Sequence, residues 1–367
     1  MMQASDTDEA EGTAPSASDD LTLATAMVWT SLFAGIWILG SILINGREFM
    51  IPIAVAIFLW QLINGVARLY GRITLAGQSP GKGLSLLAAI VTIVLCCWFL
   101  VDIVASNVAS VSTAAPGYEE NLRKLVRNTF GEAGFARIPS LEQIAERIDI
   151  GSAITSLSST LGGLLGNIGL VALYVSFLFA EQSTFDRKLD SLFTDRRKRE
   201  WVSSMLTEIE FRIERYLWLK TVVSFLTAAL CYIVLLLVGV DYSIFWALVV
   251  FLFNYIPNIG SLFAVLLPSI LTVLQFASVT AGIGVLLALA GIQFVVGNLV
   301  EPKLMGNSLN LSPLVIILSL TLWGSIWGIA GMFLCVPITV SIAIILSHFE
   351  LTRPVAILLS SDGSIGR

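Results

Sequence analysis

Long apolar runs alternate with short polar connections along most of this chain. Each run has about the twenty residues that an α-helix needs to cross roughly 30 Å of hydrocarbon. The pattern predicts five plain membrane-spanning helices and then three further apolar segments, at 21–44, 49–67, 84–107, 161–180, 217–240, 246–276, 281–300 and 313–348. We therefore expect an all-α integral membrane protein with about eight transmembrane or re-entrant helical segments. Two of the segments should be broken, both in the C-terminal half.

The sixth run is interrupted in its middle by polar and helix-breaking residues. It contains the sequence NYIPNIGS from Asn254 to Ser261, and a second interrupted region, GNLVEPKLMGNSLNLSP, begins at Gly297. Lipid cannot hydrogen-bond to freed backbone groups, so such a break needs surrounding protein or a water-lined cavity. Broken hydrophobic segments are the best pointer in a sequence to the binding site of a transporter. The pattern therefore indicates a carrier or channel rather than an inert anchor.

The polar connections suggest how the chain is organised around these spans. Residues 1–20 are acidic and rich in Ser and Ala, which predicts a disordered tail rather than a signal peptide, because no basic residue precedes the first run. Residues 108–160 should form two short amphipathic helices outside the bilayer. Residues 183–216 should form basic amphipathic helices on the cytoplasmic leaflet, in contact with anionic lipid. The transport core should span 217–348, followed by a tail at 349–367.

Composition and charge support this interpretation and give it an orientation. The chain is 56% hydrophobic and 13% charged, with a mean hydropathy of +0.86, whereas soluble domains carry about 25% charged residues. Arg68, Arg72 and Lys82 lie in one loop, and a second basic loop covers 187–215. Both loops should face the cytoplasm by the positive-inside rule. The N-terminus is then cytoplasmic, and 108–160 lies on the other side.

The sequence lacks the motifs of an enzyme or a nucleotide-driven pump. All four cysteines (Cys96, Cys97, Cys231 and Cys335) lie in apolar runs, and His348 is the only histidine. We expect no metal site, cofactor or catalytic residue, and no P-loop is present. The basic stretch DRRKRE, starting at Asp195, adjoins the membrane, so we expect lipid rather than nucleic acid as its partner.

Four motifs give the chain a family resemblance. NYIPNIGS (254–261), GNLVEPKLMG (297–306), LSPLVIILSL (311–320) and GIAGMFLCVP (328–337) occur in an order and spacing that resemble the autoinducer-2 exporter family of bacterial permeases. The resemblance covers 161–348, whereas the first three spans fit only in layout. It implies a pentameric multi-pass carrier of the bacterial inner membrane, without an ATPase. Members are associated with autoinducer-2 export and some with sodium/proton antiport. Glu301 departs from the pattern, in which an uncharged residue often precedes this proline.

Polar residues near the breaks are the candidate pathway for a solute or cation. Asn254 and Asn258 can bind a hydroxylated solute or a cation, or can satisfy the broken backbone. Asn298 is a site candidate, and Gln293 is a candidate interhelical hydrogen bond. Glu301 can carry a proton or sodium, can pair with Lys303, or can be a solvated loop acid. The full candidate set is Asn254, Pro257, Asn258, Gly260, Gln293, Asn298, Glu301, Pro302, Lys303 and Asn307, with hinges at Gly324, Gly328, Gly331 and Pro337.

Three functions remain open at this point. The first is a secondary carrier that exports a small polar solute such as an autoinducer-2-like signal. The second is a sodium/proton antiporter, which requires a deep titrating acid at Glu301 or Asp102. The third is a channel-like or scaffold assembly without coupled transport. The glycines at 162, 163 and 166 have the small-residue spacing that suits close helix packing, and we expect a homo-oligomer, with five copies implied by the resemblance.

Overall fold

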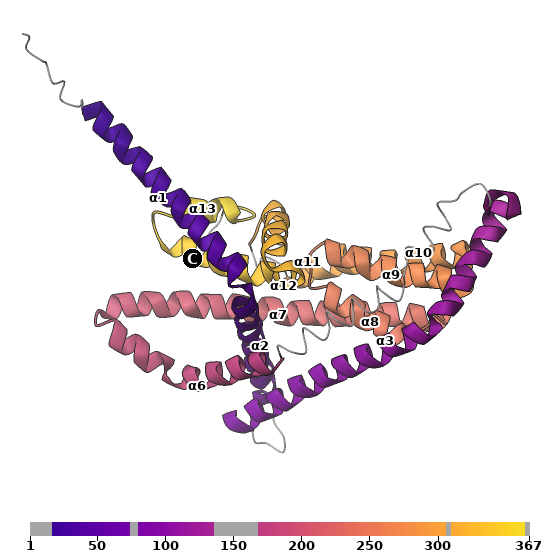
Figure 1. Ribbon diagram of the computed structural model, residues 1–367. Helices are drawn as coiled ribbons and strands as arrows, with labels where there is room; N and C mark the ends of the chain where they lie inside the picture. Colours follow the sequence, from indigo (N-terminus) through magenta and orange to yellow (C-terminus); the bar gives the residue numbers. More distant parts are fainter. Residues whose placement is uncertain (1–16, 74–79, 136–167, 306–309, 364–367) are drawn as a thin grey trace, which may run out of the picture. The chain divides into compact units, whose positions relative to one another are not determined.

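The computed structural model describes residues 17–73, 80–135, 168–305 and 310–363 (Figure 1). These residues form helices and contain no strand, so the predicted all-α class is confirmed. The helices are α1 (Ala17–Asn45), α2 (Arg47–Gly71), α3 (Lys82–Phe135), α6 (Ile168–Leu192), α7 (Arg196–Val238), α8 (Ser243–Phe253), α9 (Ile259–Phe276), α10 (Val279–Val295), the π-helix η1 (Val296–Val300), α11 (Glu301–Met305), α12 (Pro313–His348) and α13 (Arg353–Leu359).

Seven helical segments of the described chain are long and apolar enough to cross a bilayer, which makes this a multi-pass membrane protein. They are Arg47–Gly71, Lys82–Asn107, Ile168–Leu192, Arg196–Val238, Ile259–Phe276, Val279–Met305 and Pro313–His348. The chain divides into two compact units, Met1–Met50 and Ile51–Arg367. The first unit contains α1 and the first turn of α2, and the second contains the rest of the described helices.

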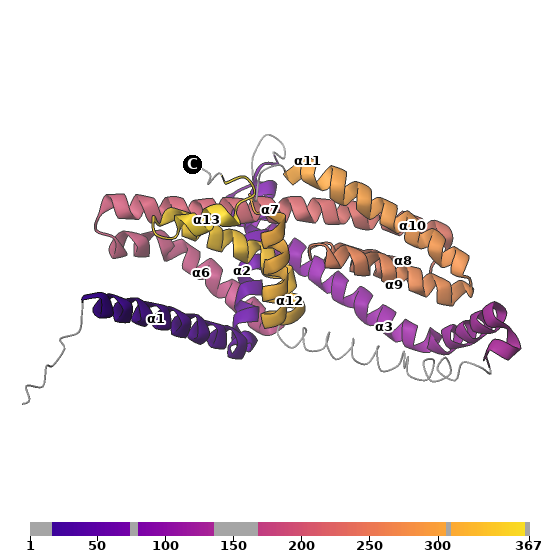
Figure 2. The same ribbon diagram turned by 90° about the horizontal axis from the view of Figure 1, so that it is seen from above.

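Two helices run further than the hydrophobic pattern indicated. α3 does not end near residue 107 but continues to Phe135, so its described part is one helix instead of a span followed by a separate short helix (Figure 2). α7 joins the expected basic amphipathic helix to the fifth span in one helix of 43 residues. Its sequence contains neither Gly nor Pro between Arg196 and Val238, so nothing stops the helix at the membrane boundary. It ends at Gly239, whose φ of 78° suits glycine.

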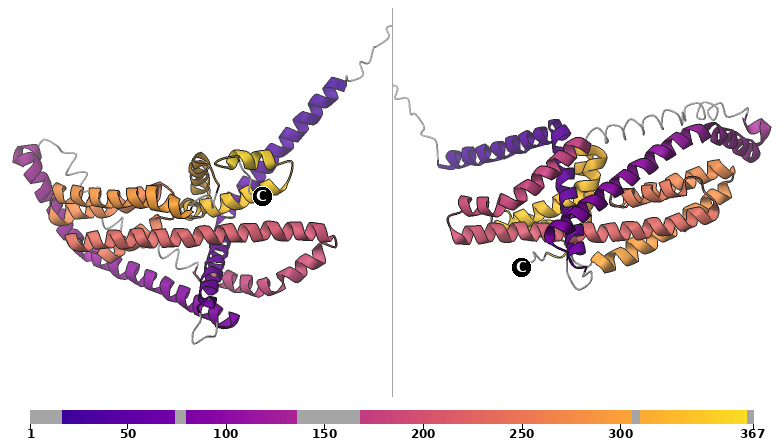
Figure 3. Two further views of the ribbon diagram at one scale, coloured as in Figure 1. Left: turned by 180° about the vertical axis from the view of Figure 1, so that it is seen from behind. Right: turned by 90° about the horizontal axis from the view of Figure 1, so that it is seen from below.

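The C-terminal half of α7 is the centre of the packing. α8 and α10 pack on it, and α9 packs on α8 and α10 (Figure 3). Their buried side chains form one apolar core, which includes Cys231, Leu235, Val250, Ala264, Val285 and Leu289. α12 also packs on α7, and α13 on α12. The interrupted segments are therefore positioned by their packing around α7.

A hydrogen-bond network ties the α3 extension to the Asp241 end of α7. Tyr118 donates to Asp241 Oδ2 at 2.9 Å, and Asn121 Nδ2 donates to the Gln275 carbonyl at 2.9 Å. The Gln275 side chain accepts from the Asp241 amide and donates to the Gly239 carbonyl. Burial and the hydrogen bond to Asp241 raise the pKa of Tyr118 well above its usual value. Tyr118 therefore remains a donor at neutral pH, and these contacts explain why α3 continues as a helix.

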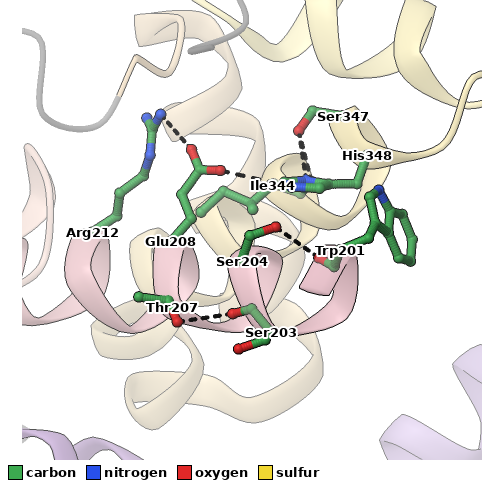
Figure 4. A network of polar contacts seen from close by, with 9 residues as sticks. All are labelled: Trp201, Ser203, Ser204, Thr207, Glu208, Arg212, Ile344, Ser347 and His348. Atoms are coloured by element: carbon green, nitrogen blue, oxygen red, sulfur yellow. Dashed lines mark hydrogen bonds and ion pairs between the residues drawn. The ribbon is translucent and has the colours of Figure 1, made fainter. Parts of the chain in front are cut away.

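A second network joins α7 and α12 at the other end of α7 (Figure 4). Glu208 accepts from Arg212 at 2.7 Å, and its other oxygen lies 3.9 Å from His348 Nε2. The Trp201 ring packs edge-on against the His348 ring. Arg68 of α2 pairs with Glu210 and Glu214 on the same stretch of α7. Three helices are therefore joined at what we call the Glu208 end.

Candidate functional site

The first interrupted segment is a helical hairpin that returns to the side on which it began. α8 and α9 are separated by Asn254–Asn258, while their far ends meet in the network around Asp241 and Gln275. The turn is tight, because a Cβ on Gly260 would lie 1.7 Å from the Phe253 carbonyl oxygen. Asn258 adopts a φ of 58°, which asparagine tolerates better than most residues. The tip of this hairpin thus lies at Asn254–Asn258.

The second hairpin lies within α12. Gly328 has φ 62° and ψ −139°, and the helix reverses there. The two arms touch closely: Ser319 Oγ bonds the Cys335 carbonyl and the Thr339 hydroxyl, and a Cβ on Gly331 would lie 1.9 Å from the Trp323 carbonyl oxygen. The base of the hairpin is closed by α13, where the Leu359 carbonyl accepts from Ser312 N. This segment also returns to its starting side, next to the Glu208 end.

The tips of the two hairpins meet. The ring of Tyr255 stacks on Phe333 with centroids 4.8 Å apart. Phe58 of α2 packs edge-on against both rings. Tyr255 belongs to the break between α8 and α9, and Phe333 lies five residues after Gly328. Two helix interruptions that start from opposite ends of α7 therefore come together at one place.

Polar side chains on one face of α7 contact the tip of the α8–α9 hairpin. Thr221 Oγ1 lies 2.7 Å from the Tyr255 hydroxyl, and Ser224 Oγ accepts from Asn254 Nδ2 at 3.1 Å. Thr221 donates to the Leu217 carbonyl, so Tyr255 is the donor in the first pair. Asn254 and Ser224 are both buried. These contacts satisfy polar groups at the break that lipid would leave unpaired.

The same face of α7 also contacts the second interrupted region of the sequence, through Glu301. Lys220 Nζ lies 2.5 Å from Glu301 Oε1, and the side chains are 7% and 22% exposed. Glu301 follows the π-helix Val296–Val300, a local irregularity that is frequent at functional sites. Glu301 therefore pairs with Lys220 of another helix and not with Lys303, which is exposed.

Some of the predicted site residues lie in the cluster where the two hairpin tips and Glu301 meet the polar face of α7, and others are exposed. Asn254, Gly260 and Glu301 belong to it, and Gly328 and Gly331 shape the second hairpin. Asn258, Asn298, Pro302 and Lys303 are exposed. The Asn298 amide donates to the Phe294 carbonyl of its own helix, and Gln293 Nε2 is buried without a hydrogen-bond partner among the described residues. Asn307 lies outside the described residues.

The sequence interpretation missed the polar face of α7. Lys220, Thr221 and Ser224 lie on one side of the helix, followed one turn later by Thr227, and all but Thr221 are less than 9% exposed. Their spacing of three to four residues inside an apolar run was the available signal. Gln61 and Asn64 of α2 were missed as well. Both are buried, and Gln61 Oε1 and Asn64 Nδ2 have no partner among the described residues.

Interrupted helices that return and bring polar groups together inside a bundle of spanning helices define a membrane transporter. The sequence comparisons give the family. Residues 26–350 match the family described as AI-2E family transporter, so the chain belongs to this family. It is 31% identical over 322 residues to a protein of Haemophilus influenzae that is named, provisionally, as a transport protein, covering 85% of this chain and 90% of the relative. It is also 35% identical over 224 residues to the AI-2 transport protein TqsA of Escherichia coli, covering 60% of this chain and 64% of TqsA.

Proposed function

We propose that this protein is a secondary permease that exports a small polar solute, such as an autoinducer-2-like signal, across the bacterial inner membrane. The observation that carries the proposal is the meeting of two hairpin tips on the buried polar face of α7. Such a site offers hydroxyl and amide groups to a solute within spanning helices. Membership of the AI-2E family and the similarity to TqsA support the class of solute. The sequence contains no P-loop, so an ion gradient is the expected energy source.

The described contacts favour one arrangement across the membrane. Tyr118, from the segment predicted to lie outside, donates a hydrogen bond to Asp241, at the Asp241 end of α7. Arg68, from a loop predicted to lie inside, pairs with Glu214 at the Glu208 end of α7. His348 also lies at the Glu208 end. We infer that the N-terminus and the end of α12 are cytoplasmic and that the α8–α9 hairpin enters from the outside.

The test is flux through the purified protein in liposomes. Vesicles loaded with autoinducer-2 should lose it faster than protein-free vesicles, and an imposed proton or sodium gradient should drive it against its own concentration gradient. Efflux equal to that of protein-free vesicles would reject the proposal. Efflux that never exceeds equilibrium under any ion gradient would indicate the channel-like alternative instead.

A sodium/proton antiporter is the second candidate, favoured by the charged pair Lys220–Glu301 inside spanning helices. The same vesicles, containing a pH-sensitive dye and no organic solute, distinguish the two. Sodium-dependent proton movement in the absence of solute supports the antiporter, whereas proton movement that requires autoinducer-2 supports the exporter.

We also propose a homo-oligomer, with five copies favoured by the family resemblance and lipid as the surrounding partner. Large apolar side chains are exposed along several spans of the protomer, among them Trp98, Phe177 and Phe225, and either lipid or a second copy can cover them. Native mass measurement in nanodiscs checks the number of copies, and a monodisperse monomer would exclude the oligomer.

A further inference from the structure

Lys220 carries a charge that needs a partner in every state of the protein. Its side chain is 7% exposed and lies in a membrane-spanning helix, paired with Glu301. An ammonium group that is buried without an anionic or strongly accepting oxygen is costly. If Glu301 leaves, another oxygen has to replace it.

Glu301 is the partner that can leave. Its side chain is 22% exposed, three times as much as that of Lys220, so water can solvate it at lower cost. It lies at the junction of η1 and α11. A π-turn holds an additional residue, and its relaxation to an α-turn rotates the residues that follow by about 100°. The backbone before Glu301 therefore has a means of moving the carboxylate away from Lys220.

The groups beside Lys220 are suited to an oxygen-rich solute. Ser224 lies one turn further on the same face of α7, and its oxygen accepts from Asn254, which leaves its proton to donate. Asn254 Oδ1 remains an acceptor for a solute hydroxyl. Tyr216, one turn before Lys220, is buried. With Glu301 removed, the described residues of this face offer the Lys220 ammonium and the Ser224 hydroxyl as donors and no fixed anion.

We propose that Lys220 is the cation that binds the solute, and that Glu301 is its internal counter-ion in the empty site. A small solute that carries a carboxylate or phosphate oxygen together with hydroxyl groups displaces Glu301 and binds between Lys220, Ser224 and Asn254. The proposal rests on the proposed function only in placing the solute at this site. It adds the charge preference of the site and the residue that sets it.

Binding in nanodiscs tests the proposal with two probes that share a carbon skeleton, glycerol 3-phosphate and glycerol. The full-length protein should bind the phosphate ester at least about tenfold more tightly, because only the ester offers Lys220 a negatively charged oxygen. Glu301→Gln should tighten binding of the ester further, since the competing carboxylate is gone. A purely structural ion pair predicts no such gain.

Two double variants separate solute binding from a purely structural role of the ion pair. Lys220→Met with Glu301→Met removes both charges, and the charge swap Lys220→Glu with Glu301→Lys keeps the pair but moves the ammonium away from Ser224. Both should keep a thermal midpoint close to that of the unchanged protein, and both should lose the preference for the ester. Lys198→Met, in the first turn of α7, where the side chain is exposed, should leave the preference unchanged and controls for non-specific anion binding.

Each outcome decides the matter. If the unchanged protein binds both probes equally, or if the charge swap retains the preference, Lys220 does not bind the solute and the proposal is wrong. Autoinducer-2 flux without any preference for the ester would leave the proposed function standing and overturn this inference alone. A preference that both double variants abolish, in a protein that moves no solute, would support the inference and reject the exporter.

Discussion

At the scale of single residues, the sequence identified the residues that are polar within apolar runs but not their partners. Asn254 and Glu301 were predicted because each interrupts a hydrophobic segment, and both lie in the cluster on α7. Lys220 lies near the start of the apolar run 217–240, and nothing in the sequence pattern points to its partner. Its role depends on Glu301, which is 81 residues away, and no periodicity shows such a pairing. Asn258 is predicted either to contact a solute or cation or to satisfy the broken backbone, and its positive φ and exposure are typical of a turn residue.

Replacement of Asn254 tests the contact that holds the first hairpin tip on α7. Asn254→Leu removes the bond to Ser224 while nearly preserving side-chain size, and the loss of a buried hydrogen bond costs about 1–3 kcal/mol. Solute affinity in liposomes should fall roughly 5- to 150-fold. The matched control is Asn107→Leu, because the Asn107 amide donates to a carbonyl of its own helix, α3. Equal transport by both variants would show that Asn254 has no role in the site.

At the scale of helices, the sequence predicted the interruptions but not that each interrupted segment turns back. α8 has 11 residues, about 16 Å of helix, and cannot cross roughly 30 Å of hydrocarbon. The return of the α8–α9 hairpin depends on a contact between residues distant in the sequence: the Asp241 amide, before α8, donates to the Gln275 side chain at the end of α9. The extension of α3 was missed for the same reason, because Tyr118 and Asn121 gain their partners from the turn between α7 and α8 and from α9.

The close approach of the two arms of α12 gives a prediction for stability. Gly331→Ala places a methyl group against the Trp323 carbonyl oxygen and should cost about 1–3 kcal/mol, because the arms have to separate. The thermal midpoint in detergent should therefore fall. Gly291→Ala on α10 is the control, since a Cβ there meets nothing within 4 Å and alanine favours the helix. A midpoint that is unchanged in Gly331→Ala would contradict the hairpin geometry.

At the scale of the whole molecule, the charge pattern and the contacts support the same proposed arrangement across the membrane. The basic loops supplied the orientation of the first five spans. They did not determine the side of the C-terminus, because a broken segment can either cross or return. The contacts of His348 with the Glu208 end of α7, and of α13 with the start of α12, support our proposal that α12 returns to the side on which it begins.

Cysteine labelling tests this topology in a cysteine-free background. Single cysteines at Arg72, Arg197 and Glu350 should resist an impermeant thiol reagent applied to intact cells, whereas one at Glu120 should react. All four positions are exposed, so a lack of reaction reports the side of the membrane and not burial. Reaction at Glu350 together with protection at Arg197 would show that α12 crosses the membrane.

The central claim is that solute passes at the polar face of α7, where the two hairpin tips meet. Ser224→Cys in the cysteine-free, transport-competent protein tests it most directly, by the rate of reaction with a small water-soluble thiol reagent in nanodiscs. Ser224 and Thr272 are both fully buried, but only Ser224 lies at the meeting point, so Thr272→Cys on α9 is the control. We predict that Ser224→Cys reacts, that autoinducer-2 slows the reaction at least about threefold by occupying the site, and that Thr272→Cys stays inert. A Ser224→Cys protein that transports autoinducer-2 yet never reacts, or reacts at the same rate with and without it, would contradict the account.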